Sequence, residues 1–299
     1  MAESTPGTAV PASYRIAVLT LAVSTYGHHL LRSLAAHGHR PALVVVLDNP
    51  LSRKVRLLRS VARRIGWRDA LLYAVDETLS PTQPSSAPRG SWPGYDKVAD
   101  AVVHVPVVST PVAANQLRRH DIDVLLLGQS GIVPQSILDA PKVGTLNAHP
   151  GWLPDFKGID CAAWTILAGR FALVGSSLHW VDAGVDTGRI IRQRQYRWRG
   201  DETLRLLEAR LYDDCIELLV NAARDLERGT LASYDNVGGA LYRKMRRADR
   251  ARAARLLSER LATLASPAPL GAPVGASDDP RDESSACITD VQGQSKDAR

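Results

Sequence analysis

The stretch YRIAVLTLAVSTYGHHLLRSLAAHGHRPALVVVLD, residues 14–48, decides the fold class. It begins and ends with short apolar runs that are typical of strands buried in a parallel sheet. Between these runs, Leu30, Leu31 and Leu34 recur at helical spacing until Gly38, a residue type that often ends helices. A strand, a helix and a second strand in this order predict a βαβ unit, with parallel strands and helices on the faces of the sheet.

The same alternation continues along the chain. Residues 101–107 and 121–128 are predicted to be strands on either side of a helix at 110–120. A short helix at 134–139 then leads into a further strand at 143–150. These units predict an α/β fold with a doubly wound, mostly parallel, Rossmann-like sheet.

The pattern changes in the second half of the chain. A helix near 160–169 is followed by strands at 173–182 and 188–198, whose partial alternation predicts an antiparallel pair. A long helix at 201–228 is predicted to end at Gly229.

Composition divides the chain into four parts. Residues 1–12 are predicted to be a flexible N-terminus, and 13–230 form the main α/β domain. Residues 231–265 form a short helical extension with a basic helix starting near 241. Residues 266–299 are rich in Pro, Gly, Ser and charge, so we expect a disordered tail.

Overall composition favours a globular protein of the cytoplasm. With 45% hydrophobic and 23% charged residues, and no apolar run of 18 or more, the chain does not resemble a membrane protein. The first residues lack a secretory signal, and the three cysteines are unclustered, which argues against both a disulfide framework and a zinc site.

The net charge of +6 permits an anionic substrate or nucleic acid without requiring one. The Arg-rich segment 53–68 is either a solvated helix face or a patch for phosphate or RNA.

Polar residues follow the last predicted strand of the first half, in TLNAHPGWLPDFKG, residues 145–158. Asn147 and His149 alternate on this strand and project to the same side, at the sheet edge where α/β proteins bind ligands. Asp186 lies in VDAGVDTG, residues 181–188, between the two later strands.

An amide, an imidazole and a carboxylate that converge suit acyl transfer. The amide and a protonated imidazole can stabilise an oxyanion, while the carboxylate orients the imidazole and relays protons. There is no GxSxG motif, and Cys161 has no evident basic partner, so the acyl group is expected to pass directly to a bound nucleophile without a metal.

LNAHPGWLPDFKG followed by SSLHWVDAGVDTGRII resembles the N10-formyltetrahydrofolate-dependent formyltransferase family. That family includes glycinamide ribonucleotide, methionyl-tRNA and sugar-nucleotide formyltransferases. The resemblance covers residues 14 to about 230 and is strongest between 121 and 192. It implies a Rossmann-like catalytic domain and N10-formyltetrahydrofolate as co-substrate.

The resemblance also implies roles for individual residues. Asn147 matches the amide that binds the formyl oxygen, His149 matches the catalytic imidazole, and Asp186 matches the carboxylate that organises the His and a water. His179 matches a recurrent His that we expect to be structural. The loops around the folate are expected to contribute Gly128, Ser130, Ile132, Val133, Asp182 and Val185.

Three features depart from the family pattern. Gly151 stands where the family often has Ser, and Trp152 stands where an aliphatic residue is common, so we expect the acceptor specificity to differ there. The glycine-rich phosphate loop of glycinamide ribonucleotide enzymes is replaced by LAVSTYGHHLL, which argues against a purine-pathway role.

We therefore expect transfer of a formyl group to an amine of a small molecule, such as an amino sugar nucleotide or an amino acid-like metabolite. A tRNA acceptor is disfavoured, because the segment after Gly229 does not show the pattern of the C-terminal barrel that the resemblance implies for tRNA enzymes. A methionyl-tRNA formyltransferase-like enzyme, a formyltetrahydrofolate hydrolase and a catalytically silent folate-binding protein remain alternatives. The sequence leaves the oligomeric state open, a homodimer included.

Overall fold

The computed structural model describes residues 14–22, 24–48, 59, 62–63, 66–68, 71–72, 94–106, 111–229 and 231–265. The predicted flexible N-terminus and the predicted tail, 266–299, lie outside these ranges, and so does most of the Arg-rich segment 53–68.

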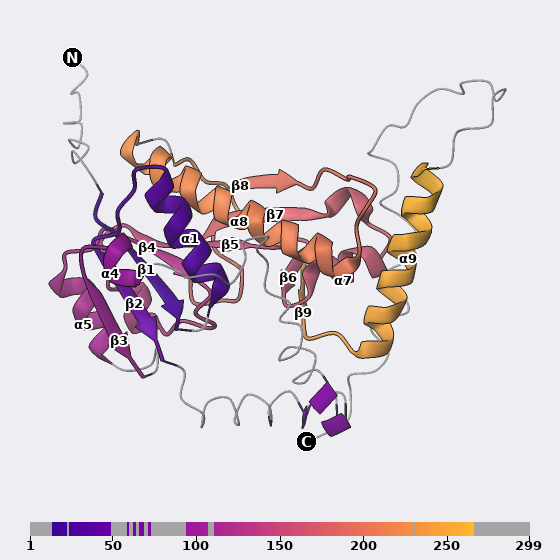
Figure 1. Ribbon diagram of the computed structural model, residues 1–299, viewed down its shortest axis with the longest axis horizontal. Coiled ribbons are helices and arrows are strands. Elements are labelled where there is room, and N and C mark those ends of the chain that lie inside the picture. Colours follow the sequence, from indigo (N-terminus) through magenta and orange to yellow (C-terminus); the bar gives the residue numbers. More distant parts are fainter. Residues whose placement is uncertain are drawn as a thin grey trace, which may run out of the picture. The chain divides into compact units, whose positions relative to one another are not determined.

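A seven-stranded sheet in the order β3-β2-β1-β4-β5-β7-β8 forms the centre of the described fold (Figure 1). Its first five strands are mutually parallel, whereas β7 pairs antiparallel with both β5 and β8. The mostly parallel sheet and the antiparallel pair at its edge are both confirmed. The strands are β1 (Ile16–Leu21), β2 (Leu43–Leu47), β3 (Val102–Val105), β4 (Val124–Gly128), β5 (Gly144–His149), β7 (Gly175–Trp180) and β8 (Ile190–Gln195).

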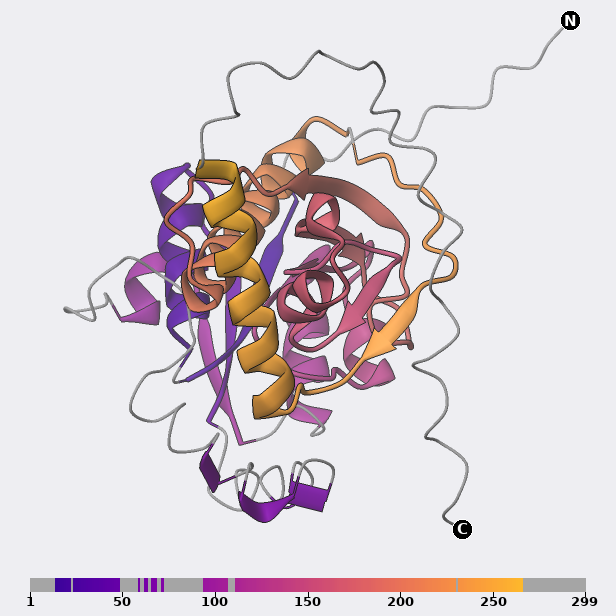
Figure 2. The ribbon, with the colours of Figure 1, turned by 90° about the vertical axis from the view of Figure 1, so that its right-hand side faces the viewer.

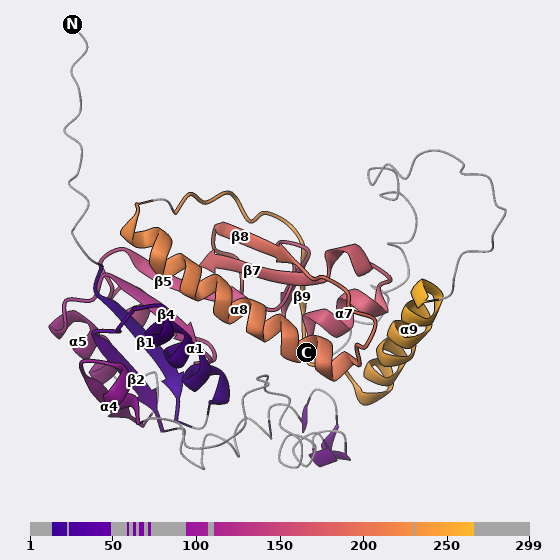
Figure 3. The same cartoon turned by 45° about the horizontal axis from the view of Figure 1, so that its top comes forward.

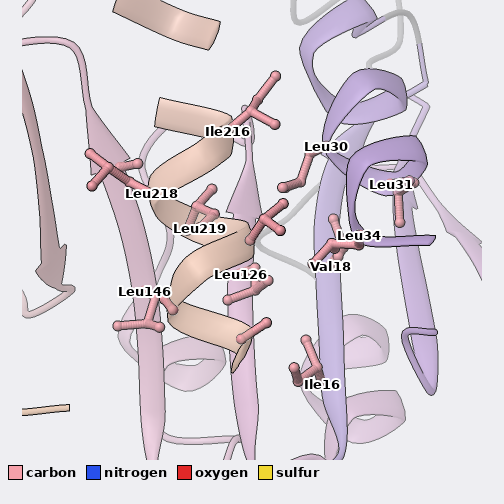
Figure 4. Close-up of a cluster of buried hydrophobic side chains, with 14 of the residues drawn as sticks. Ile16, Val18, Leu30, Leu31, Leu34, Leu126, Leu146, Ile216, Leu218 and Leu219 are labelled. Atoms are coloured by element: carbon pink, nitrogen blue, oxygen red, sulfur yellow. The ribbon is translucent and has the colours of Figure 1, made fainter. Parts of the chain in front are cut away.

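Helices cover the two faces of this sheet. Helices α1 (Thr25–Ala36) and α8 (Leu204–Glu227) pack on the face that carries Ile16 and Val18 of β1, as Figures 3 and 4 show. Helices α5 (Pro111–Arg119) and α6 (Gln135–Leu138) pack on the other face, and the short α4 (Tyr95–Val98) lies beside α1. Because side chains alternate along a strand, β1 supplies both hydrophobic clusters and is buried almost throughout.

Helix α8 has clear signals at both ends. The Thr203 side chain accepts a hydrogen bond from the backbone N–H of Leu206, and Gly229 follows the helix with a positive φ of 65°. The predicted end of this helix is therefore confirmed. No helix within the described ranges combines the length and apolar character that a membrane crossing requires.

The described C-terminal residues add a small sheet and a third core. Strand β9 (Ala240–Tyr242) pairs in parallel with β6 (Phe156–Gly158), and α9 (Arg247–Ala265) packs with α8 and α7 (Cys161–Leu167), beside the 3₁₀ helix η1 (Phe171–Leu173) (Figure 2). The last helix was expected from about residue 241. It starts later because β9 takes the first of these residues and Asp160 binds both Lys244 Nζ and the backbone N–H of Met245.

Candidate active site

The carboxyl end of β5 holds Asn147 and His149, which lie opposite His179 and Ser177 of β7. Asp186 comes from the loop that joins β7 to β8. The antiparallel pairing places Trp180, the last residue of β7, opposite Leu146, and the loop then turns back so that Asp186 faces His149. The topology thus brings a strand end and a distant loop to one point.

Four side chains meet there. His149 Nδ1 lies 3.5 Å from Asp186 Oδ2, and His179 Nε2 lies 3.6 Å from Asp186 Oδ1. Asn147 Nδ2 is 3.1 Å from His179 Nε2. The structure therefore brings together the three predicted catalytic residues, Asn147, His149 and Asp186. His179, for which a structural role was expected, contacts two of them.

Neighbouring carbonyls fix the tautomers of both imidazoles. His149 Nε2 lies 3.0 Å from the Phe156 carbonyl oxygen, which can only accept, so Nε2 carries a hydrogen and Nδ1 faces Asp186. His179 Nδ1 lies 2.7 Å from the Trp180 carbonyl oxygen and donates to it. His179 Nε2 therefore accepts from the Asn147 amide, which leaves that amide a second N–H for another acceptor.

Asp186 is held as a carboxylate. Burial raises its pKa, but the protonated forms of the facing His149 and His179 imidazoles and the backbone N–H of Gly158 outweigh burial and lower the pKa to about 2. The Gly158 N–H donates to Asp186 Oδ2 over 2.8 Å. The backbone of Asp186 is left-handed, with a φ of 53°. A charged acceptor is thus presented to His149 from a fixed turn.

The neutral imidazole is the favoured form of His149 at neutral pH, because the pKa of His149 lies below its ordinary value. Burial lowers its pKa, and the nearby Asp186 carboxylate offsets that effect only in part. The sequence motif suggested a protonated imidazole. Protonating His149 costs free energy, because a charge would be buried on a residue that is only 4% exposed. The pair of neutral His149 and ionised Asp186 can therefore take up one proton.

Gly151 determines where the His149 ring can lie. A Cβ at Gly151 would come within 2.5 Å of His149 Nε2 and 2.8 Å of Cys161 Cβ, closer than real contacts allow. Trp152 points elsewhere, because a Cβ at Gly175 would meet its indole at 2.9 Å. Gly151 thus lies against the His149 ring, and Trp152 packs on the start of β7. A role of either residue in acceptor choice stays a prediction.

The predicted folate-binding residues differ in exposure. Ser130 is buried directly after Gly128 and Gln129, whereas Ile132 is 81% exposed and Val185 is 40% exposed. Val133 packs against the α5 and α6 side of the core. Asp182 accepts hydrogen bonds from the Gly184 N–H and the Thr187 hydroxyl, so it braces its own loop. Folate binding by these residues stays a prediction.

Sequence reasoning missed three contributions to the site. The Phe156 carbonyl and the Gly158 N–H act through the backbone, so their residue types give no signal. Asn236 reaches the Asp186 loop from beyond α8, in a stretch that contains no motif. Only its placement in the fold reveals its contact with the site.

Comparison with known proteins identifies the family. The formyl transferase family model matches residues 104–223, which include β5, β7 and the Asp186 loop. The chain belongs to the formyl transferase family. The resemblance seen in the sequence motifs is thereby confirmed.

Two relatives in this family are methionyl-tRNA formyltransferases. The one from Paraburkholderia xenovorans is 33% identical over 67% of this chain and 56% of its own length. The one from Paraburkholderia phytofirmans is 30% identical over 74% of this chain and 62% of its own length. The chain thus spans somewhat more than half the length of these curated relatives.

A solved structure supports the same fold. An N-formyltransferase from Helicobacter canadensis, in complex with folinic acid and dTDP-3-aminofucose, superposes with a TM-score of 0.50 at 16% identity. The match covers 77% of this chain and 70% of that chain. At this identity the likeness concerns the fold alone.

Proposed function

We propose that this protein is a cytoplasmic enzyme that transfers the formyl group of N10-formyltetrahydrofolate to a primary amine of a small molecule. The observation that carries the proposal is the meeting of Asn147, neutral His149 and ionised Asp186 at the end of β5. Membership of the formyl transferase family supports the same chemistry.

In this proposal the amine nitrogen attacks the formyl carbon, a new C–N bond forms, and the formyl oxygen becomes an oxyanion. The second N–H of the Asn147 amide donates to that oxyanion. An amine proton passes to Nδ1 of His149, and the resulting imidazolium is stabilised by Asp186 and helps to stabilise the oxyanion. The tetrahedral intermediate then collapses, the bond from carbon to N10 breaks, and the proton moves to N10.

The nature of the acceptor is the less constrained part of the proposal. The sequence favours a small amine, and the solved structure that holds dTDP-3-aminofucose is consistent with it. The names of the curated relatives make the amino group of methionyl-tRNA the second candidate.

The direct test is a screen of acceptors with N10-formyltetrahydrofolate, read by product mass. The panel holds amino sugar nucleotides, amino acid-like amines and methionyl-tRNA, with one sample lacking any amine. A gain of one formyl group on a small amine is the expected result. Formylation of methionyl-tRNA alone would identify the second candidate. Formate release without an amine would indicate a hydrolase, and folate binding without turnover would indicate a silent protein.

Variants test the assigned roles in the same assay. We expect Asn147→Ala and His149→Ala each to lower kcat by about 10²- to 10³-fold, because each removes a group that stabilises the oxyanion. Binding of a stable folate analogue should remain measurable.

The pH profile gives a second readout. His149 must be neutral to accept a proton, so the rate should fall as the pH drops through its pKa, which lies below the ordinary 6.5. Near-normal turnover in His149→Ala, or a rate that increases as the pH falls below 6.5, would contradict these roles.

A further inference from the structure

Asn236 lies in the segment that follows α8, and its side chain contacts the loop that carries Asp186. Its Nδ2 donates to the Asp186 carbonyl oxygen and to the Gly188 carbonyl oxygen, each over 2.9 Å. Both partners are carbonyls and can only accept, so the nitrogen of the Asn236 amide must face them. One amide group therefore holds the backbone on both sides of Thr187.

The turn held in this way is an unfavourable one for the chain by itself. Asp186 has a φ of 53°, a region that non-glycine residues seldom adopt. Gly188 passes so close to the neighbouring strand that a Cβ would lie 1.8 Å from the Trp180 carbonyl oxygen. Such a backbone persists only where surrounding contacts fix it. The two hydrogen bonds of Asn236 supply contacts of this kind.

Asn236 is itself fixed from both directions along the chain. Two residues before it, Tyr234 exchanges two backbone hydrogen bonds with Ile190, of 2.9 and 2.8 Å. Two residues after it, the Gly238 carbonyl oxygen accepts from Lys157 Nζ over 2.7 Å. Strand β9 then pairs with β6, whose Gly158 donates to the Asp186 carboxylate. The segment is thus attached to β8 on one side and to β6 on the other.

We propose that Asn236 is a positioning residue whose amide fixes the turn 186–188, so that the Asp186 carboxylate faces both His149 and His179. Asn236 lies outside residues 104–223, where the family model matches. Its effect on turnover rests on the proposed function, whereas its effect on the geometry of Asp186 does not.

The first test therefore needs no substrate. The pKa of His149 is measured by NMR titration of the imidazole in the full-length protein and in Asn236→Ala. The groups that face His149 are the Asp186 carboxylate, His179 and the Phe156 carbonyl; burial lowers the pKa of His149, and the Asp186 charge offsets part of that effect by raising it. When the turn loosens, Asp186 spends less time near His149, so the pKa should be lower in the variant. A pKa equal to that of the unaltered protein would overturn the proposal.

The second test is kinetic. Asn236→Ala should lower kcat by about 10- to 100-fold, because misplacing a catalytic group by about 1 Å has effects of this size. The KM for the folate and the affinity for a stable folate analogue should change little. The acid limb of the pH profile should move to lower pH together with the pKa of His149. A change in KM alone would contradict a positioning role.

A neighbouring residue provides a matched control. Asp235 pairs with Arg189 and is 73% exposed, so Asp235→Ala removes an ion pair of the same segment without touching the turn. We expect its kcat and its His149 pKa to match those of the unaltered protein. Equal losses in Asp235→Ala and Asn236→Ala would show a general effect of the segment and overturn the proposal.

One outcome separates this proposal from the proposed function, and a second variant covers a failure to fold. If the unaltered protein formylates no amine, the proposed function fails, while the NMR titration still tests the role of Asn236. If Asn236→Ala does not fold, Asn236→Ser retains one short donor, and a smaller shift of the His149 pKa in the same direction is expected. An unchanged pKa in Asn236→Ser would then count against the proposal.

Discussion

At the scale of the residue, the absence of a side chain at Gly151 leaves space for the ring of His149, a candidate catalytic residue. A Cβ of residue 151 would lie only 2.5 Å from His149 Nε2, which is directed at the Phe156 carbonyl. Cys161 closes the other side of the same space. The resemblance led us to expect an effect of Gly151 on acceptor choice. The geometry gives it a more direct role, which is to leave room for the imidazole.

Replacing Gly151 should therefore move the catalytic ring. In Gly151→Ala the new methyl group would overlap His149 Nε2, so the ring must rotate away from Phe156 and its distance to Asp186 must change. We expect kcat to fall by about 10²-fold, with folate-analogue binding retained. Steady-state kinetics and a binding titration measure the two effects.

Trp152→Phe is the control for that prediction, because the indole packs against Gly175 and not against His149. We expect this variant to keep most of its kcat. Full activity in Gly151→Ala would show that the ring can adjust at no cost.

At the scale of the element, an ion pair joins the last two long helices. Glu208 of α8 and Arg250 of α9 form a bidentate pair, with 2.8 Å between Nη1 and Oε1. The side chain of Glu208 is only 12% exposed, and its burial raises its pKa despite the paired guanidinium. Arg250 also lies 3.8 Å from Asp160, at the start of α7. The pair thus connects three helices around the third hydrophobic core.

Removing Arg250 should destabilise the protein through the charge left on Glu208. We expect Arg250→Ala to lower the free energy of unfolding by about 2–3 kcal/mol at pH 8, because a buried carboxylate loses its partner. Because burial raises the pKa of Glu208 in the folded state, the folded protein accommodates the protonated side chain better than the carboxylate. The loss should therefore be smaller below pH 4.5, where Glu208 is protonated in both states. Urea denaturation at the two pH values measures this difference.

Two further variants make the prediction specific. Glu208→Gln in the Arg250→Ala background should recover part of the loss, because no buried charge remains. Arg255→Ala removes an exposed pair with Glu259 and should change stability by less than about 0.5 kcal/mol. An equal loss in Arg255→Ala would show that substitutions in α9 lower stability in general, and that the charge left on Glu208 is not the cause.

At the scale of the whole molecule, the segment after Gly229 supports the α/β domain and the site. It supplies Asn236 to the Asp186 turn and strand β9 to β6. It also covers Leu204, Leu207 and Leu211 of α8 with apolar side chains, which are Met245, Ala253, Leu257 and Leu261. Within the described residues, no core residue lies beyond Leu261. The chain up to Ala265 therefore contains every described part of the fold.

Two shortened chains should differ accordingly. A chain that ends at Ala265 lacks only the predicted tail, so we expect its melting temperature and turnover to match those of the full chain. A chain that ends at Gly229 exposes the apolar face of α8 and loses Asn236, so we expect it to melt at a much lower temperature and to lack turnover. Circular dichroism melting curves and the formyl-transfer assay compare them. Loss of activity on removing 266–299 would assign a function to that segment.

Local sequence determined the strands of the seven-stranded sheet, the helices α1, α5, α6, α7 and α8 and the candidate catalytic residues, but not β6, β9 or α4. Runs such as LVVVL in β2 must be buried on both faces, and Leu30, Leu31 and Leu34 share one side of a helix, so their elements follow from hydrophobicity and spacing alone. Asn147, His149 and Asp186 were recognisable because their motifs are local.

Tertiary structure alone decided how these residues act. The antiparallel pairing of β7 places His179 beside Asn147, the loop after β7 brings Asp186 to His149, and burial lowers the pKa of that imidazole. The contact of Asn236 with the Asp186 loop joins residues separated by 50 positions. A desolvation energy and a long-range hydrogen bond depend on which surfaces meet, and spacing along the chain carries no information about that.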